Sequence, residues 1–123
     1  FLFANTHLPM IFQTLEVFQK DLKKLSKKYP TLVTDLEVVK KVLVLHPEAK
    51  PPFSFVLQGL GIETPIIKIK KIASRSFKGR GVQSGFRLVY AFYPEEDRIV
   101  FIELFHKTKQ LNEDRQRILL HFR

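Results

Sequence analysis

The sequence contains no cysteine and no tryptophan among its 123 residues. The absence of cysteine excludes a disulfide framework and zinc sites with thiolate ligands. No apolar run approaches the roughly 18 residues that a transmembrane helix needs. A chain without cysteine suits a reducing compartment, so we expect a cytoplasmic protein that does not span a membrane.

Positive charge and apolar residues are what the chain has in quantity. Hydrophobic residues make up 45% of it, and its formal net charge is +9 at pH 7. A chain of this length can bury a core without disulfides or metals, so we expect residues 10–123 to form one domain after a poorly ordered extension over residues 1–9. The charge favours a negatively charged partner, although a merely basic soluble protein is the alternative.

Acidic residues are missing altogether between Glu63 and Glu95. The run IIKIKKIASRSFKGRGVQSGFRLVYAFY (66–93) alternates cations with apolar residues, breaks at three glycines and then resumes as a strand. A flexible basic loop between two strands with basic faces is a suitable surface for a polyanion. The seven cations of this stretch are Lys68, Lys70, Lys71, Arg75, Lys78, Arg80 and Arg87.

The spacing of apolar residues predicts the order of the elements. Apolar residues at steps of three and four predict helices over 15–29 and 32–46, joined at Pro30 as a helical hairpin. Alternating patterns predict strands over 10–14, 67–70, 86–93 and 99–105, with a short edge strand over 53–57. A last helix is expected over 111–122. The lysines of the first helix are interpreted as a solvated face rather than a binding site; they are Lys20, Lys23, Lys24, Lys27 and Lys28.

This order predicts an α+β fold: a small antiparallel sheet with an N-terminal helical hairpin and a short C-terminal helix. The helices should cover one face of the sheet and leave the other partly open. Lys68 and Lys70 share one face because strand side chains alternate, and Arg87 joins them if the register allows it. The same alternation places Glu103 with Phe101 and Phe105, away from the lysines.

The segments IKIKK, KGRGVQSGFRLVY and IVFIELFHK, with the opening TLEVFQKDLKKL, resemble the RelE/ParE toxin superfamily. The resemblance covers roughly residues 10–120 and is nearest to the HigB-like and RelE-like branches. It implies a RelE-like fold and the toxin component of a type II toxin–antitoxin system, a metal-independent endoribonuclease (mRNA interferase) that inhibits translation, usually on the ribosome. The implied partners are mRNA, the ribosome and a cognate antitoxin, in a homodimer or a toxin–antitoxin heterotetramer, with no membrane, metal or cofactor.

Metal-free RNA cleavage requires activation of the 2′-OH, stabilisation of a crowded anionic phosphate and protonation of the departing 5′-oxygen. Arg87 stands where the family's GFR/GYR pattern has a phosphate-binding arginine, and arginine grips phosphate with two hydrogen bonds. Further catalytic candidates by resemblance are Lys70 and Lys68 on the preceding strand, and His106 and Lys107 at the end of the last strand. The candidate RNA-binding residues are Lys71, Arg75, Lys78, Arg80 and Lys109.

The C-terminal region TKQLNEDRQRILLHFR lacks the tyrosine that many RelE-like nucleases carry near the start of their last helix. Tyr90 and Tyr93 lie on the middle strand and its turn, so they do not replace it directly. Two alternatives to an mRNA endoribonuclease therefore stay open. One is a ParE-like inhibitor of DNA gyrase without enzymatic activity, and the other is a basic RNA- or ribosome-binding domain that does not cleave.

Overall fold

The structure is a computed structural model that describes residues 9–122. The extension expected over residues 1–9 thus falls almost wholly outside the described residues. No helix between residues 9 and 122 has the length and apolar character that crossing a membrane requires. The elements, in order, are β1 (Ile11–Thr14), α1 (Glu16–Lys28), α2 (Leu32–Leu45), β2 (Ser54–Val56), β3 (Ile66–Ile69), β4 (Phe86–Tyr93), the short 3₁₀ helix η1 (Pro94–Glu96), β5 (Arg98–His106) and α3 (Arg115–Phe122).

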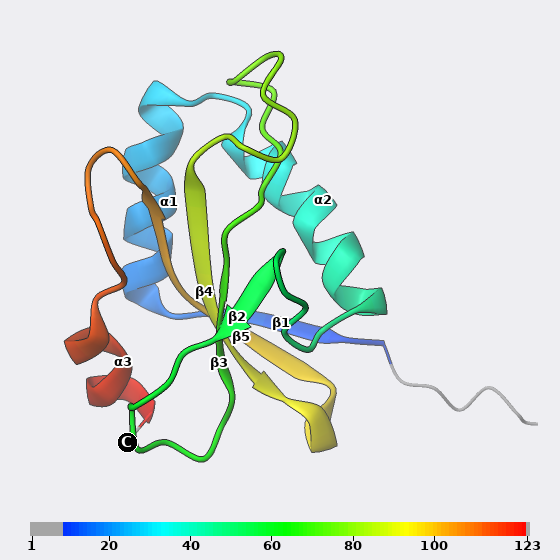
Figure 1. The fold of residues 1–123 in the computed structure, drawn as a ribbon, viewed down its shortest axis with the longest axis vertical. Coiled ribbons are helices and arrows are strands. Elements are labelled where there is room, and N and C mark those ends of the chain that lie inside the picture. The colour runs from blue at the N-terminus through cyan, green and yellow to red at the C-terminus, as the bar shows by residue number, and fades with distance from the viewer. Residues whose placement is uncertain (1–8, 123) are drawn as a thin grey trace, which may run out of the picture.

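The five strands form one sheet in the order β1-β5-β4-β3-β2 (Figure 1). As predicted, β2 pairs antiparallel with β3, β3 with β4, and β4 with β5. The sheet is mixed rather than wholly antiparallel, because β1 runs parallel to β5 along that strand's outer edge. The α+β class is confirmed, and the added parallel strand covers an edge that the β4–β5 hairpin would leave unpaired.

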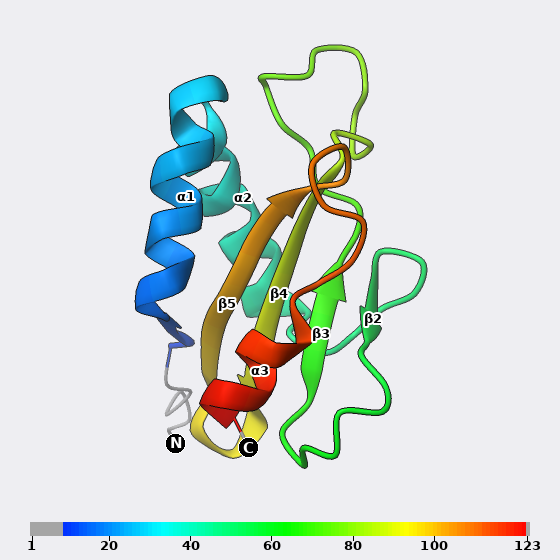
Figure 2. The same ribbon diagram turned by 90° about the vertical axis from the view of Figure 1, so that its left-hand side faces the viewer.

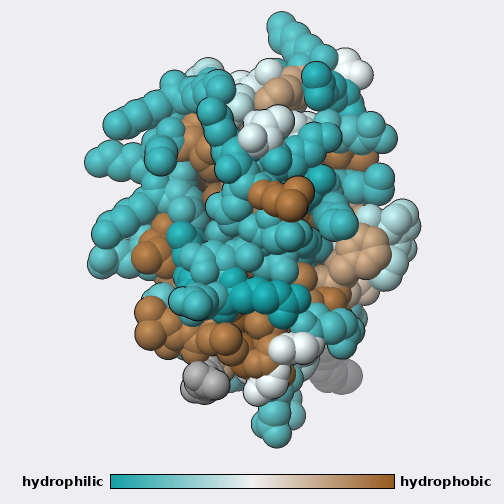
Figure 3. All heavy atoms as spheres, turned by 60° about the vertical axis from the view of Figure 1, so that its left-hand side comes forward, coloured by the Kyte–Doolittle hydropathy of each residue, from teal (hydrophilic) through white to brown (hydrophobic). Residues whose placement is uncertain are grey.

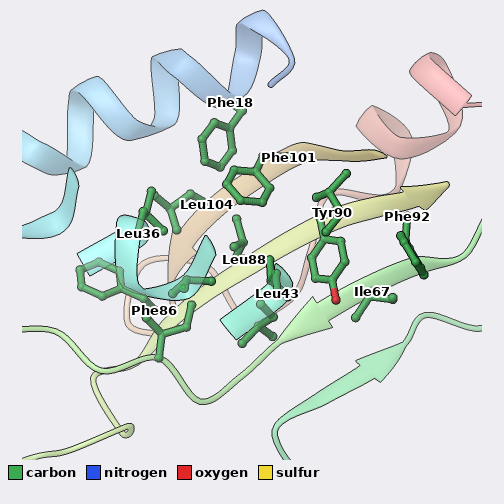
Figure 4. Close-up of a cluster of buried hydrophobic side chains, with 14 of the residues drawn as sticks. Phe18, Leu36, Leu43, Ile67, Phe86, Leu88, Tyr90, Phe92, Phe101 and Leu104 are labelled. Atoms are coloured by element: carbon green, nitrogen blue, oxygen red, sulfur yellow. The ribbon is translucent and has the colours of Figure 1, made fainter. Parts of the chain in front are cut away.

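One face of the sheet packs against α1 and α2, which lie together on the same side of it (Figure 2). Phe18 of α1 contacts Phe101 of β5 with ring centroids 5.3 Å apart. Leu88 and Tyr90 of β4 extend this core toward α2 (Figure 4). The Tyr90 hydroxyl donates a 2.7 Å hydrogen bond to the Pro47 carbonyl oxygen, so this tyrosine serves the core.

The second face of the sheet is covered over only part of its length. Ile118 of α3 is fully buried against Val89, Ile102 and Phe105 of the strands. Arg117 also holds α3 down, because it donates to both carboxylate oxygens of Asp21 (2.7 and 3.3 Å). This face is therefore closed under α3 and open toward the ends of β3 and β5 and the start of β4.

A β-bulge opposite Val89 and Tyr90 changes which way β5 points its side chains. Val89 pairs with Glu103 and Tyr90 with Phe101, which leaves Ile102 as the extra residue. Because two residues on the bulged strand then oppose one, alternation fails there. The prediction that Glu103 lies away from the lysines is wrong: Glu103, Val89 and Lys68 are direct cross-strand neighbours on one face.

The C-terminal helix is shorter than predicted and begins at Arg115 rather than near residue 111. The Asp114 carboxylate accepts a 3.1 Å hydrogen bond from the Arg117 backbone N–H, which is how a capping side chain starts a helix. Leu111, which the predicted helix face included, is 87% exposed. Residues 107–114 instead form a connection that crosses the second face of the sheet.

Candidate nucleic-acid interface

The glycine-rich basic loop between β3 and β4 is attached to the rest of the fold near both of its ends. The buried Asp35 carboxylate of α2 accepts hydrogen bonds from the Ser74 hydroxyl (2.6 Å) and the Arg75 backbone N–H (3.2 Å). At the other end, the Ser84 hydroxyl donates to the Ile72 carbonyl oxygen (2.6 Å). The loop lies at the top of the molecule in Figures 1 and 2 and presents its cations to solvent.

Four of the predicted site residues meet in a cleft of about 340 Å³ beside this loop. We call it the first basic cleft. Its cations come from the end of β3, the start of β4 and the residue after β5: Lys70, Lys71, Arg87 and Lys107. The rest of its wall consists of Pro52, Phe55, Val82, Gln83 and Gly85, so no acidic residue lines it.

Arg87 is held in place through one nitrogen and leaves the others available. Its Nη1 donates to the carbonyl oxygens of Lys70 (3.0 Å) and Phe86 (3.3 Å). Within residues 9–122, neither Nε nor Nη2 of Arg87 has a hydrogen-bond partner. Burial lowers the pKa of Arg87 from its usual value. Since a guanidinium stays charged in proteins, this side chain offers a fixed, partly desolvated cation.

None of the four cations in the first basic cleft forms an ion pair with the described residues. The Lys70 ammonium instead lies over the Phe55 ring, 5.3 Å from its centroid, which steadies the side chain without neutralising it. Like charges gathered around one hollow repel each other. An anion in the cleft would relieve that repulsion, so the arrangement favours binding of a negatively charged group.

Lys68 is on the same sheet face as Lys70 but does not reach the cleft. Its Nζ donates a 2.6 Å hydrogen bond to Glu113 Oε1, and the two side chains are only 12% and 6% exposed. Burial tends to raise the pKa of Glu113. The Lys68 hydrogen bond, a backbone hydrogen bond and the charges of Lys68 and Arg115 outweigh burial, so that pKa lies below its usual value. Lys68 thus ties β3 to the segment before α3.

His106 also lies outside the first basic cleft, because its ring points to the helix side of the sheet. It is buried and stacks on Phe77, with ring centroids 5.3 Å apart. The Thr108 backbone N–H donates to Nδ1 (3.2 Å), so Nε2 carries the proton and donates to the Ser84 carbonyl oxygen (2.8 Å). Both ring nitrogens are therefore engaged in joining the end of β5 to the end of the basic loop.

Gly85 makes this joint possible. Its φ is 95°, and a Cβ there would lie 2.6 Å from His106 Nε2 and 3.3 Å from Lys107 Cε. A side chain at this position would displace the histidine and disturb a cation of the cleft. The third glycine of the loop is thus required where β4 and β5 come together.

The remaining predicted RNA-binding residues surround the cleft or lie beyond it. Arg75, Lys78 and Arg80 are exposed on the basic loop, and Lys109 is exposed after β5. Figure 3 shows one face of the molecule, turned by 60° from the view of Figure 1. Hydrophilic side chains cover most of the upper half of this face, and apolar side chains gather below them. Of the predicted catalytic and RNA-binding residues, the structure brings Lys70, Lys71, Arg87 and Lys107 together in the first basic cleft.

Five residues of the cleft wall were not predicted as site residues, and two of them are Phe55 and Gln83. The alternation of residues 53–57 predicted a strand, but only the register shows that Phe55 pairs with Lys68 and so lies on the lysine face. Gln83 forms an isolated bridge with Ile72. Nothing in a loop sequence signals such a contact.

The first basic cleft can hold and polarise a phosphate, but it lacks an ordinary acid–base pair. Among residues 9–122, no histidine, carboxylate or tyrosine lines it. Within the described residues, no group of three or more His, Cys, Asp or Glu side chains could bind a metal ion. The chemistry available there is electrostatic stabilisation by Arg87 and protonation by a lysine ammonium.

Comparison with known proteins gives a fold and no function. No protein-family model matches the chain, and no curated protein matches it. The chain is similar to the solution structure of the conserved hypothetical protein HP0892 from Helicobacter pylori, with a TM-score of 0.50 and 19% sequence identity. The similarity covers 81% of this chain and 97% of that chain. At this identity the likeness shows a shared fold alone.

Proposed function

We propose that the protein is the toxin component of a type II toxin–antitoxin system, a RelE-like or HigB-like endoribonuclease that cleaves mRNA on the ribosome. The observation that carries the proposal is the first basic cleft, where four cations that form no ion pair within residues 9–122 surround one hollow. A phosphodiester is the anionic group that suits it, because RNA presents phosphates in a row. The segments that resemble the superfamily supply all four of the cleft's cations, Lys70, Lys71, Arg87 and Lys107.

In this reaction the ribose 2′-oxygen attacks the adjacent phosphorus and the bond to the 5′-oxygen breaks, which leaves a 2′,3′-cyclic phosphate and a free 5′-hydroxyl. Arg87, through its unpartnered Nε and Nη2, stabilises the extra negative charge on the phosphate. The ammonium of Lys70 or Lys107 protonates the leaving 5′-oxygen. Among the described residues the cleft has no carboxylate or histidine to take the 2′-OH proton, so this proton passes to solvent water.

A second candidate is an RNA-binding domain that does not cleave. The observation that favours it is the cleft's lack of a histidine, carboxylate or tyrosine. Such a domain would bind RNA with an affinity that falls linearly, on logarithmic axes, as salt increases, and would leave the RNA intact.

The partners of the proposed toxin are the ribosome with its mRNA and a cognate antitoxin. An antitoxin with acidic residues would inhibit by placing carboxylates in the first basic cleft, where no acidic residue of this chain competes. This inhibition should weaken with rising salt as far as it is electrostatic.

The test is to incubate translating ribosomes with the purified protein and map the ends of the mRNA. We expect cuts at codon resolution from the wild type and a loss of about 10²–10³-fold in Arg87→Ala, the usual cost of removing a donor to a developing anion. Arg98→Ala is the matched control. Arg98 is the first residue of β5, at the end of the strand opposite to the first basic cleft. We expect it to cut like the wild type.

Intact mRNA in the presence of folded wild-type protein would exclude cleavage. RNA binding that persists in that case would support the second candidate. A DNA supercoiling assay run in parallel separates both from a gyrase inhibitor, because a nuclease or an RNA-binding domain leaves gyrase active.

A further inference from the structure

A second hollow of about 510 Å³ lies between α1 and the end of β5, at the edge of the sheet. We call it the second basic cleft. Three lysines line it: Lys24 and Lys28, one turn apart on α1, and Lys109, which follows β5. The other lining residues are Asp21, Leu25, Tyr29, Leu104, Phe105, His106 and Gln110.

Asp21 and Gln110 of this lining already have hydrogen-bond partners. The Asp21 carboxylate accepts from Arg117 Nη1 (2.7 Å) and from the Leu104 backbone N–H (3.1 Å). The Gln110 side-chain nitrogen donates to Glu103 Oε2 (2.7 Å) and to the Asn112 carbonyl oxygen (2.7 Å). Asp21 therefore does little to offset the lysines.

The three lysines themselves form no ion pair within residues 9–122. Lys28 lies over the Tyr29 ring, 5.5 Å from its centroid, and so leans toward the hollow rather than straight into solvent. Lys24 and Lys28 are exposed, in agreement with the solvated face predicted for the first helix. They form one wall of a cationic hollow.

The two basic clefts meet at the turn that follows β5. The backbone N–H groups of Lys109 and Gln110 both donate to the His106 carbonyl oxygen (3.0 and 3.2 Å), which folds residues 106–110 tightly. Lys107 lines the first cleft and Lys109 the second. Their Cα atoms are two peptide units apart, hence at most about 7.6 Å. A strand of nucleic acid that occupied both clefts would cross this turn.

We propose that the second basic cleft binds the backbone phosphates of the same single-stranded RNA whose scissile phosphate occupies the first basic cleft. This inference rests on the proposed function and extends it to the path of the substrate. Lysines suit such a subsite, because an ammonium on a flexible stem contacts phosphates without reading sequence. An RNA strand is favoured over an acidic peptide because this cleft adjoins the first one and, like it, has cations that no acidic residue neutralises.

The experiment measures binding of 2′-O-methyl RNA, which cannot be cleaved at a 2′-OH, as a 12-mer and as a dinucleotide over a series of salt concentrations. The variant is Lys24→Gln/Lys28→Gln. The matched control is Lys20→Gln/Lys23→Gln, which removes the same charge from exposed positions of the same helix that do not line the cleft.

We expect the cleft variant to bind the 12-mer about tenfold more weakly than the control, and the slope of log affinity against log salt to become shallower by about 1.4, two phosphate contacts on a single strand. Dinucleotide binding should be equal in the two variants, because a dinucleotide occupies only the first cleft. The dinucleotide comparison also shows that both variants are folded.

Equal 12-mer affinities and slopes in the two double variants would overturn the inference while leaving the proposed function intact. If the wild type binds neither RNA, the proposed function fails and the inference fails with it. Oligoglutamate serves as the acidic peptide. If it binds the wild type more tightly than the 12-mer does, and if only the cleft variant loses that binding, the inference is overturned and this cleft is assigned to an acidic peptide.

Discussion

Lys68 and Lys70 are two residues apart on β3 and its continuation, on the same face of the sheet. They differ in their exposure and in their ion pairing. Lys68 is buried under the segment before α3 and paired with Glu113. Lys70 is exposed and has no acidic neighbour in its cleft. The same contrast extends across the face: Arg115 and Arg117 of α3 are paired with carboxylates, while Arg87 and Lys107 form no ion pair within residues 9–122.

The difference follows from the cost of removing charge from water. A buried cation must be compensated, so the covered end of the face pairs its cations with Glu113 and Asp21. At the open end, water can solvate the lysines, and the fold gains nothing by adding carboxylates there. Cations left unpaired in this way are available to a partner, which is why function is assigned to the open end and stability to the covered end.

The largest expected effect tests the covered end. Lys68→Met should lower the free energy of unfolding by about 3 kcal/mol, because it leaves the largely buried Glu113 carboxylate with Arg115, 3.3 Å away, as its remaining cation within residues 9–122. Lys70→Met is the matched control: the same change on the same sheet face at an exposed site, expected to cost less than about 0.5 kcal/mol. Urea unfolding monitored by circular dichroism measures both.

The double variant Lys68→Met/Glu113→Met should recover most of the loss, since an apolar pair can replace a buried ion pair. Equal free energies of unfolding for Lys68→Met and Lys70→Met would contradict this prediction. The ion pair at the covered end would then contribute nothing measurable to stability.

The second prediction adds an acidic residue to the open end of the face, next to its unpaired cations. Gln83→Glu adds a carboxylate of nearly the same shape to the wall of the first basic cleft. We expect RNA affinity to fall about tenfold, or about 1.4 kcal/mol, because the new charge neutralises one cation and repels phosphate. Fluorescence anisotropy with a labelled RNA measures the change.

Gln116→Glu provides the control, since it adds the same charge at an exposed position of α3 that does not line the cleft. A comparable loss of affinity in this variant would mean that net charge, rather than the cleft, governs binding.

Much of the fold was predictable because it depends on local patterns. The alternating apolar residues of 86–93 matched β4 residue for residue, and the helical hairpin began and ended within two residues of its predicted bounds. Such periodicities reflect one buried face per element, which a sequence displays directly. The bulge at Ile102 was not predictable, because the pattern of β5 is apolar on both sides of it.

The candidate site was predictable in its charge but not in its membership. The acid-free segment pointed to Lys70, Lys71 and Arg87, which do meet in one cleft. Alternation could not separate Lys68 from Lys70, because the difference is made by Glu113, 45 residues away. His106 is likewise separated from its neighbour Lys107 by the alternation of β5, and its stacking partner Phe77 comes from the basic loop.

The smallest expected effect is the response of the covered end to acid. The pKa of Glu113 is lowered in the folded protein, despite its burial, by Lys68 and the other groups around it. A carboxyl whose pKa is lower folded than unfolded stabilises the fold above its unfolded value of about 4.3. That stabilisation is lost as the pH falls through the lower, folded pKa.

Glu103 acts in the opposite sense, because burial raises its pKa against the opposing hydrogen bonds from Gln110 and Asp114. Its contribution to stability therefore declines as the pH rises above about 4.3. Urea unfolding of the wild type and Glu113→Gln between pH 7 and pH 3 should show a smaller acid-induced loss in the variant. An equal loss in both would mean that Glu113 is not what makes the paired end sensitive to acid.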